Sequence, residues 1–439
     1  MLYKTLKKEF IYLIFLFVGN LTYAQLIHDT PESVRLNSNY IETNVDSIMH
    51  DAIMQKAFPG AQLLVAKKGK IIFHKTYGFH TYDSIQKVAK DDVYDLASVT
   101  KIAGPLPALM KLYEEGKLDL DKPFSNYWPS WGSRSDKKNI TLRELLAHQS
   151  GMNPYIVFLN SVMKKGKPKN RFIKSQKKKR YSSQVYNNIY VKNRFNRKVF
   201  RKINRSKVND KKTYVYSGLA SLIYPTLIEN ISGENYEDYL SNNFYKLLGA
   251  EILGYNPLSK GYKNNIVPTE LDTLFRNDYV KAFVHDENAA LLGGVSGNAG
   301  LFATALDMAK FMQMLVQKGT YNGKQYFKQT TVEEFISIQY PENDNRRGLG
   351  FDKPLIGNDT LNIKEAYPAP QVSPTSFGHS GFTGTFVWAD PEHELVFIFL
   401  SNRVYPSRSH RNIYNLNVRP KLQQVFYTSP TSEEKLTNN

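Results

Sequence analysis

Cysteine is absent from the 439 residues of this chain. This absence excludes disulfide bonds, catalysis by a thiolate, zinc sites with cysteine ligands and the lipid-bearing cysteine of a lipoprotein. The chemistry of the chain therefore does not pass through a thiol.

Long apolar runs are also missing. The longest candidate, residues 11–21 (IYLIFLFVGNL), is too short to cross a bilayer comfortably, because a spanning helix needs about 20 apolar residues. Three lysines within residues 4–8 precede this run, and Thr-Tyr-Ala at 22–24 follows it, which is typical of a secretory signal peptide cleaved after Ala24. We therefore expect an exported protein, periplasmic or secreted; the alternative is an uncleaved N-terminal anchor.

Acidic residues are almost absent from residues 161–212. This segment holds twenty Lys or Arg and a single acid, Asp210, so it accounts for the whole net charge of +18. It has few regular apolar positions, and we interpret it as an inserted loop, partly disordered. Three roles stay open: a solvated loop, a surface for an anionic cell-envelope polymer or membrane, or a nucleic-acid site. Aromatic residues interleave with the charges, as stacking surfaces would, but export argues against nucleic acid; they are Tyr181, Tyr186, Tyr190, Phe195 and Phe200.

Hydrophobic periodicity predicts strands at both ends of the chain and helices between them. The expected strands are a pair within 58–78 and a hairpin within 383–402, and the expected helices lie within 46–57, 102–115, 140–151, 218–247, 304–319 and 411–427. The fold class is therefore α/β, of the α+β type, with one antiparallel sheet built from both chain ends, flanking helices and an inserted helical lobe. The expected divisions are a signal peptide (1–24), a leader (25–45), one domain (46–427) containing the basic insert, and a polar tail (428–439).

The most informative motif is Ser98-Val99-Thr100-Lys101. At a helix start, a serine and a lysine three residues apart lie on the same face of the first turn. A serine hydroxyl is a weak nucleophile, and a partly desolvated lysine can take its proton. The spacing alone is common by chance, so its meaning depends on the other motifs.

Three further motifs follow in order. Tyr216-Ser217-Gly218 opens a helical stretch, HDENAALLGGVSGNAGLF begins at His285, and His379-Ser380-Gly381 stands before the C-terminal hairpin. With FPGAQLLVAKKGK, SVTK, GKLDLDKP, TLRELLAHQSGM and GHSGFTGTFVWADP, this series resembles the serine β-lactamase and penicillin-binding-protein superfamily. The likeness covers roughly residues 50–405 and points to the branch of class C β-lactamases, D,D-peptidases and related esterases.

The resemblance implies catalytic roles. Ser98 would be the nucleophile, and Lys101 would deprotonate it or tune its neighbours. Tyr216 would carry a proton to the leaving group and then from the attacking water. The bland alternative for Tyr216 is a core tyrosine. No cofactor and no metal are implied.

The remaining implied residues bind the substrate. His379-Ser380-Gly381 would match the edge-strand triad, written Lys-Thr-Gly in many members and His-Ser/Thr-Gly in esterase-like ones. The oxyanion hole would consist of the backbone N–H groups of Ser98 and Phe382, and glycine at 381 would let a substrate backbone lie close to the strand. The alternative for His379 is a hydrogen-bonded structural histidine.

The sequence gives less evidence of a catalytic role for the other histidines. We interpret His148 as structural, holding the loop after its helix. His285 stands beside two acids, but no HExxH or paired-histidine spacing supports a metal site. The glycines between 293 and 300 lack the context of a phosphate loop.

One position departs from the family pattern. β-Lactamases of this branch carry Asn two residues after the tyrosine, where this chain has Gly218. The sequence therefore predicts an exported serine hydrolase that acts on a small ester or a cell-wall-related D-amino-acid peptide, with β-lactam hydrolysis in doubt. The alternatives are a D,D-carboxypeptidase or β-lactamase proper, and a non-catalytic sensor of peptidoglycan fragments.

Overall fold

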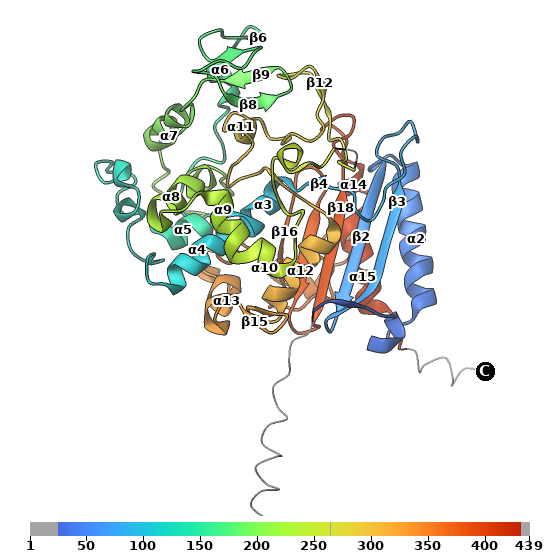
Figure 1. Cartoon of the computed structure of the whole chain (residues 1–439). Helices are drawn as coiled ribbons and strands as arrows, with labels where there is room; N and C mark the ends of the chain where they lie inside the picture. Colours follow the sequence, from blue (N-terminus) through green and yellow to red (C-terminus); the bar gives the residue numbers. More distant parts are fainter. Residues whose placement is uncertain (1–24, 264, 432–439) are drawn as a thin grey trace, which may run out of the picture.

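A six-stranded sheet joins the two ends of the chain in the computed structural model, which describes residues 25–263 and 265–431 (Figure 1). Strand β1 pairs in parallel with β3, and every other neighbouring pair is antiparallel. The expected sheet is therefore confirmed. Its strands, in spatial order, are β1 (Ile27–His28), β3 (Lys70–Gly78), β2 (Gly60–Lys67), β18 (Leu395–Ser401), β17 (Phe386–Asp390) and β16 (Phe377–Ser380).

Both faces of this sheet are buried. Along β2, Leu64 packs in one hydrophobic core while Leu63 and Val65 pack in the other, because successive side chains of a strand point to opposite faces. Strand β18 alternates in the same way, and Leu64 pairs with Ile398 in register. Burying one large apolar side chain stabilises a fold by about 1.5–3 kcal/mol, so the paired ends of the chain form a firm base for the site.

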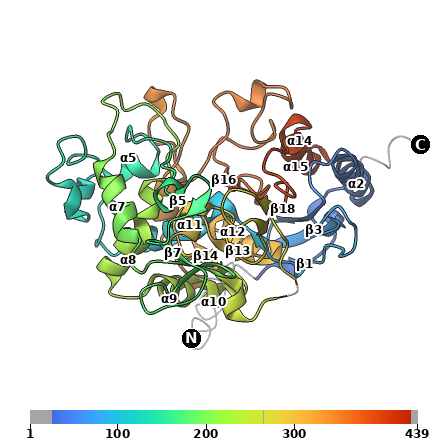
Figure 2. The ribbon, with the colours of Figure 1, turned by 90° about the horizontal axis from the view of Figure 1, so that it is seen from above.

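Helices cover the two faces of the sheet (Figure 2). On one face lie α2 (Ser38–Met54), α14 (Asn412–Asn415) and α15 (Val418–Thr428). On the other face lies α12 (Ala305–Val316), which contacts β2, β17 and β18.

The helical lobe and three small sheets fill the middle of the chain. The sheets are β10–β13–β4, β11–β12 and β14–β15, with β4 (Tyr94–Asp95), β10 (Gly254–Tyr255), β11 (Leu271–Asp272), β12 (Asp278–Tyr279), β13 (Leu301–Ala303), β14 (Thr320–Tyr321) and β15 (Lys324–Gln325). The helices are α3 (Thr100–Ala103), α4 (Pro105–Glu114), α5 (Leu142–Leu146), α8 (Tyr224–Ser232), α9 (Tyr236–Leu240), α10 (Lys246–Leu248), α11 (Glu287–Ala290) and α13 (Gln329–Ile336).

The expected leader is part of the fold. Within residues 25–45, β1 extends the sheet, and α2 begins at Ser38 with the Asn37 side chain accepting a hydrogen bond from Tyr40 N at 2.9 Å. Leu26, Val34, Leu36 and Ile41 are buried. The prediction of a leader was wrong because these apolar residues stand singly among polar ones. The expected signal peptide (1–24) lies outside the described residues, as does the tail from 432 onward.

The basic insert is folded as well. It consists of α6 (Leu159–Val162), β5 (Met163–Lys164), β6 (Lys167–Pro168), β7 (Ile173–Lys174), β8 (Ser183–Tyr186), β9 (Ile189–Val191) and α7 (Asn196–Arg205). Ile173, Val191, Val199 and Ile203 are buried in the main core. The prediction of a partly disordered loop was therefore wrong. Within residues 25–263 and 265–431, no helix has the length and apolar character needed to cross a bilayer.

Candidate active site

A buried carboxylate shapes the backbone in front of Ser98. Asp95 Oδ1 accepts a hydrogen bond from Ala97 N at 2.8 Å, and Oδ2 accepts one from His285 N at 2.6 Å. Burial raises the pKa of Asp95 despite these two bonds. Ala97 has φ +46°, a left-handed conformation that is costly for a residue with a Cβ. The bonds to Asp95 thus hold a strained turn that leads into the 3₁₀ turn Ala97–Val99 (η2) and places Ser98 at its centre.

Ser98 and Lys101 lie side by side, as the spacing predicts. Lys101 Nζ donates to Ser98 Oγ at 2.9 Å and to the carbonyl oxygen of Asn298 at 3.1 Å. Lys101 is buried, whereas Ser98 is partly exposed. The ammonium is therefore shielded from water on the side away from the serine hydroxyl.

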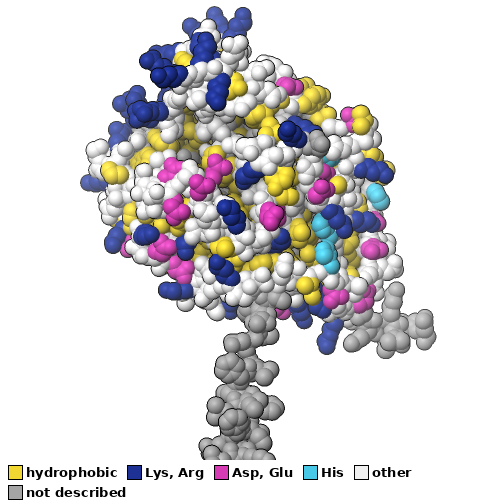
Figure 3. All heavy atoms as spheres, in the orientation of Figure 1, with side chains coloured by type: hydrophobic (Ala, Val, Ile, Leu, Met, Phe, Trp, Pro, Cys, Tyr) yellow, Lys and Arg dark blue, Asp and Glu magenta, His cyan; other side chains and the backbone are white. Residues whose placement is uncertain are grey.

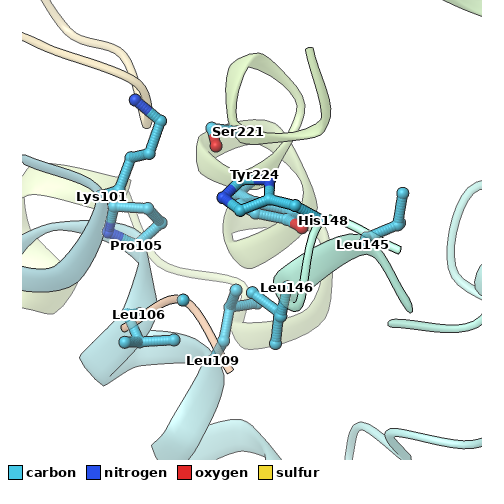
Figure 4. Close-up of a pocket in the computed structure, with 10 residues that line it drawn as sticks. Lys101, Pro105, Leu106, Leu109, Leu145, Leu146, His148, Ser221 and Tyr224 are labelled. Carbon is cyan, nitrogen blue, oxygen red and sulfur yellow. The ribbon is translucent and has the colours of Figure 1, made fainter. Parts of the chain in front are cut away.

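A small apolar cavity lies behind Lys101 (Figure 4). Its volume is about 20 Å³, close to that of one water molecule. His148, Ser221 and Tyr224 contribute its polar groups. The remaining lining is aliphatic or glycine: Pro105, Leu106, Leu109, Leu145, Leu146 and Gly350.

Tyr216 stands between two cations. Lys101 Nζ and the Arg347 guanidinium carbon each lie 5.2 Å from its ring centre. Burial acts to raise the pKa of Tyr216, but the positive charges of Lys101 and Arg347 outweigh it, and the net shift is downward. Tyr216 is therefore a better proton donor and acceptor near neutral pH than an ordinary tyrosine.

Two neutral histidines flank Tyr216. The His148 ring centre lies 4.6 Å from that of Tyr216. The ring centre of His379, in strand β16, lies 6.1 Å from that of Tyr216. Burial is the largest cause holding the pKa of both histidines well below the ordinary value, followed by the charges of Arg347 and Lys101. His148 Nδ1 accepts from Ser217 N at 3.3 Å, a contact that fixes the backbone directly after Tyr216.

His379 keeps one ring nitrogen without a partner. Its Nδ1 donates to the carbonyl oxygen of Ser380 at 2.7 Å, which fixes the tautomer and leaves Nε2 as an acceptor. Nε2 is buried and has no hydrogen-bond partner among the described residues. An unpartnered buried acceptor beside Tyr216 is suited to a donor on a bound molecule or a water.

The turn after β16 is hydrogen-bonded to the segment that precedes Ser98. Thr383 Oγ1 donates to the carbonyl oxygen of Asp95 at 2.8 Å, and Thr385 Oγ1 donates to that of Leu96 at 3.0 Å. A Cβ on Gly381 would stand 2.0 Å from Thr385 Oγ1 and 2.5 Å from Leu96 O. Glycine is therefore required at position 381 because the backbone there packs closely against Leu96 and Thr385 of the same chain. The reason expected from the sequence, the close approach of a substrate, is a different one.

A cleft of about 460 Å³ opens beside Ser98. Phe382 is 45% exposed at its mouth, and its ring stacks on His285 with centres 5.7 Å apart. The cleft is lined by Ala97, Ser98, Tyr155, His285, Asp286, Glu287, Asn298, Ala299, Phe382 and Arg408.

Hydrogen bonds and ion pairs organise the charged wall of this cleft. His285 Nε2 contacts Glu270 Oε2 at 2.5 Å, and Arg408 bridges Glu270 at 2.9 Å and Glu287 at 2.8 Å. Asn298 Nδ2 donates to Asp286 Oδ1 at 3.1 Å. The passage that begins at His285 thus forms a polar wall of the cleft that Ser98 also lines, and the His285 ring contacts the Glu270 carboxylate.

Sequence comparison agrees with this arrangement: the family model Beta-lactamase matches residues 41–419. The chain belongs to the beta-lactamase family. Members of this family related to the chain are serine hydrolases, and the chain is a β-lactamase-like serine hydrolase.

Curated relatives in the beta-lactamase family align over nearly the whole chain. An N-acetylmuramyl-L-alanine amidase of Bacillus subtilis (strain 168) is 28% identical over 417 residues, covering 88% of both chains. A putative D-alanyl-D-alanine carboxypeptidase of Escherichia coli (strain K12) is 27% identical over 405 residues, covering 87% of this chain and 86% of the relative.

Solved structures share the beta-lactamase fold. EstCE1, described as a hydrolase with promiscuous acyltransferase activity, has a TM-score of 0.62 at 16% identity and covers 88% of this chain and 98% of its own. A class C β-lactamase from Rhodobacter sphaeroides has a TM-score of 0.60 at 15% identity, with 88% and 100% covered. At these low identities, the TM-scores show that the fold is shared.

The structure brings Ser98, Lys101, Tyr216 and His379 into one site of this beta-lactamase-family fold. Sequence reasoning missed Arg347 and Asp95. Arg347 is buried, donates from Nε to the Tyr214 hydroxyl at 3.2 Å and faces Tyr216. Its surroundings in the sequence, NDNRRGLG, resemble an exposed loop, so no local signal distinguishes it. Asp95 stands three residues before Ser98, where a turn-forming acid is a weak signal.

Proposed function

We propose that this protein is an exported hydrolase that forms an acyl-enzyme on Ser98 and cleaves an ester or an amide bond. The observation that carries the proposal is the 2.9 Å contact between Lys101 Nζ and Ser98 Oγ, with Tyr216 beside both under a lowered pKa. A serine at an ordinary helix start has no need of a buried lysine and an activated tyrosine.

In the acylation step, Ser98 Oγ attacks the carbonyl carbon of the substrate. The Oγ proton passes to the Lys101–Tyr216 pair, and the carbonyl electron pair moves onto oxygen. When the tetrahedral intermediate collapses, the bond to the leaving group breaks and Tyr216 returns a proton to that group. In deacylation, water attacks the acyl carbon and gives a proton to the same pair. The bond between that carbon and Ser98 Oγ then breaks, Oγ takes a proton from the pair, and the carboxylic acid product leaves.

Backbone amides of Ser98 and Phe382 are proposed as the oxyanion hole. Support comes from the fastening of the 381–385 turn to the backbone of Asp95 and Leu96, which fixes the two amides relative to one another. Preorganised donors of this kind stabilise developing charge without reorganising. Ser380, Gly381 and His379 Nε2 would then bind the rest of the substrate on the β16 side.

The proposed substrate is a small ester or a cell-wall-related D-amino-acid peptide. A cleft of about 460 Å³ suits a small molecule or a short peptide fragment. The relatives named as amidase and carboxypeptidase favour the peptide, and Gly218 favours an ester over a β-lactam.

Location and partner belong to the same proposal. The signal-peptide pattern before Gln25 supports export, and the basic insert supports an anionic polymer of the cell envelope as partner.

Hydrolysis screening tests the proposal. Purified protein is assayed with p-nitrophenyl esters, nitrocefin and D-Ala-D-Ala peptides, and is labelled with a fluorophosphonate and with penicillin. Intact-mass analysis should show one adduct on the native protein and on Ser259→Ala, an exposed serine, and none on Ser98→Ala. An adduct that survives in Ser98→Ala refutes the nucleophile, and a protein that binds peptidoglycan fragments without turnover or adduct is the sensor.

A further inference from the structure

Eight basic side chains of the insert line a cleft. A cavity of about 780 Å³ lies between α7 and the segment around β7 and β9. Its lining includes eight basic side chains and no acid: Arg171, Lys192, Arg194, Arg197, Lys198, Arg201, Lys202 and Arg205. Figure 3 shows Lys and Arg gathered on the part of the molecule that the insert forms.

Helix α7 is built to present these charges. Val199 and Ile203 bury one face, and Asn204 Oδ1 accepts from the indole nitrogens of Trp128 and Trp131 at 3.0 Å each. The five basic residues of α7 fall at spacings of one and four, so they share the other face. The helix is thereby held firmly while its basic face lines the cleft.

The basic residues of α7 lower the stability of this helix. Arg197 and Arg201, Lys198 and Lys202, and Arg201 and Arg205 are like-charge pairs four residues apart, which destabilise a helix. None of the eight cleft cations forms an ion pair among the described residues. A local conflict of this kind is typical of a functional site, and a bound anion would relieve it.

We propose that this cleft binds a linear polyanion with phosphate in its backbone. Five of the eight cations are arginines, whose planar guanidinium groups match phosphate oxygens two at a time. A cleft lined from both sides accommodates a strand-like polymer. The proposal makes the envelope partner of the proposed function more specific. It rests on the proposed export of the protein, but not on its hydrolase activity.

Two other phosphate-bearing partners fit less well. A membrane surface calls for a broad exposed apolar surface beside the charges. Tyr155 and Val157, on either side of the lining residue Ile156, are exposed, but the described residues from 158 to 213 add no exposed large hydrophobic residue to them. Single-stranded nucleic acid calls for open aromatic faces, but of the two rings in the cleft lining, Phe172 is covered by Lys198 Nζ at 4.3 Å and Phe195 is buried.

The cleft adjoins the active site. Tyr155 lines the cleft beside Ser98, whereas the next residue, Ile156, lines the basic cleft. Asn288 in α11 donates to Ile156 O at 3.0 Å and accepts from Phe158 N at 3.2 Å, which fixes this shared wall. A polymer held in the basic cleft therefore concentrates the enzyme on envelope material next to its catalytic opening.

Binding of poly(glycerol phosphate) to the full chain tests the proposal. The cleft variant is Arg197→Gln/Arg201→Gln/Arg205→Gln, all exposed positions, and the matched control is Lys164→Gln/Lys165→Gln/Lys167→Gln, which removes three charges elsewhere in the insert. We expect the cleft variant to lose at least tenfold in affinity, and the slope of log affinity against log salt to fall by about 2. The control should stay within twofold to threefold of the native protein.

Several results would overturn the proposal. Equal losses in the two variants would indicate diffuse attraction rather than a cleft. Tighter binding of single-stranded DNA, hyaluronate or phosphatidylglycerol vesicles than of poly(glycerol phosphate) would assign a nucleic acid, a carboxylate polymer or a membrane instead. Hydrolysis of a small neutral ester, measured on the same variants, should be unchanged. A native protein that hydrolyses the ester but does not bind poly(glycerol phosphate) refutes the cleft alone. A native protein that binds the polymer but hydrolyses no substrate refutes the proposed function alone.

Discussion

Lys101 Nζ lies 2.9 Å from Ser98 Oγ, within hydrogen-bond distance of the hydroxyl that it is proposed to activate. Its second acceptor is the backbone oxygen of Asn298 at 3.1 Å, and the Tyr216 ring faces it at 5.2 Å. We propose that lysine, serine and tyrosine act as one proton-transfer unit. The identity of the base within that unit decides how each substitution behaves.

Replacing Lys101 by alanine should lower kcat for an ester nearly as much as Ser98→Ala, because residues that act as a unit lose function together. Lys101→Arg should not restore activity, since arginine does not give up its proton near neutral pH. Stopped-flow acylation with a p-nitrophenyl ester measures both, and Lys111→Arg on α4 is the control. A Lys101→Arg enzyme with nearly native kcat would make the lysine a fixed charge and Tyr216 the base.

Tyr216→Phe should reduce kcat by roughly 10²–10⁴-fold with a smaller change in KM, because the hydroxyl moves protons and contributes little to ground-state binding. Steady-state kinetics of Tyr216→Phe and of its neighbour Tyr214→Phe provide the comparison. Tyr214 is exposed and its hydroxyl contacts only Arg347 among the hydrogen-bonded residues described, so its loss should be mild. A drop below tenfold in Tyr216→Phe would leave that residue a packing role.

Arg347 should set the pH dependence of the reaction. Its positive charge lowers the pKa of Tyr216, so Arg347→Gln should raise that pKa and move the rising limb of kcat/KM to higher pH. Asp352 keeps a partner in this variant, because Arg346 lies 3.0 Å from the same carboxylate oxygen. The control is Arg346→Gln, which should leave the limb in place. If the pH profiles of Arg347→Gln and the native enzyme coincide, Arg347 serves packing rather than Tyr216.

The paired ends of the sheet were predictable because β2, β3, β17 and β18 are long, apolar and bounded by turns. The order of the strands was not predicted, because two hairpins can be joined along either edge. The N-terminal 25–45 segment was not predictable in this way, since its buried residues are isolated and β1 has only two residues that pair with β3. A two-residue strand has no periodicity to detect.

The basic composition of the insert is the reason why its secondary structure was not predicted from the sequence. Its buried residues, such as Val199 and Ile203, are spaced four apart as on any amphipathic helix, but lysine and arginine dominate the composition. For the site, Ser98, Lys101, Tyr216 and His379 stand in motifs with fixed order. Arg347 reaches Tyr216 from 131 positions away along the chain, through tertiary packing alone.

Gly218 offers the sharpest test of substrate preference. A side-chain amide at this position would hold the amide beside a β-lactam ring, and the native protein lacks it. We therefore expect the native enzyme to turn over its best ester much faster than nitrocefin. A Cβ built on Gly218 meets no atom within 4 Å and the backbone is not left-handed, so Gly218→Asn fits without strain.

Gly218→Asn should raise kcat/KM for nitrocefin by about 5- to 150-fold, because a hydrogen bond of this kind contributes about 1–3 kcal/mol. Ester hydrolysis should change little, since small esters carry no such amide. Gly218→Ala is the matched control, which adds a methyl group without an amide and should leave nitrocefin turnover at the native level. Equal nitrocefin rates in the Asn and Ala variants would mean that another residue already supplies the amide contact. A native enzyme that hydrolyses nitrocefin as fast as its best ester would lead to the same conclusion.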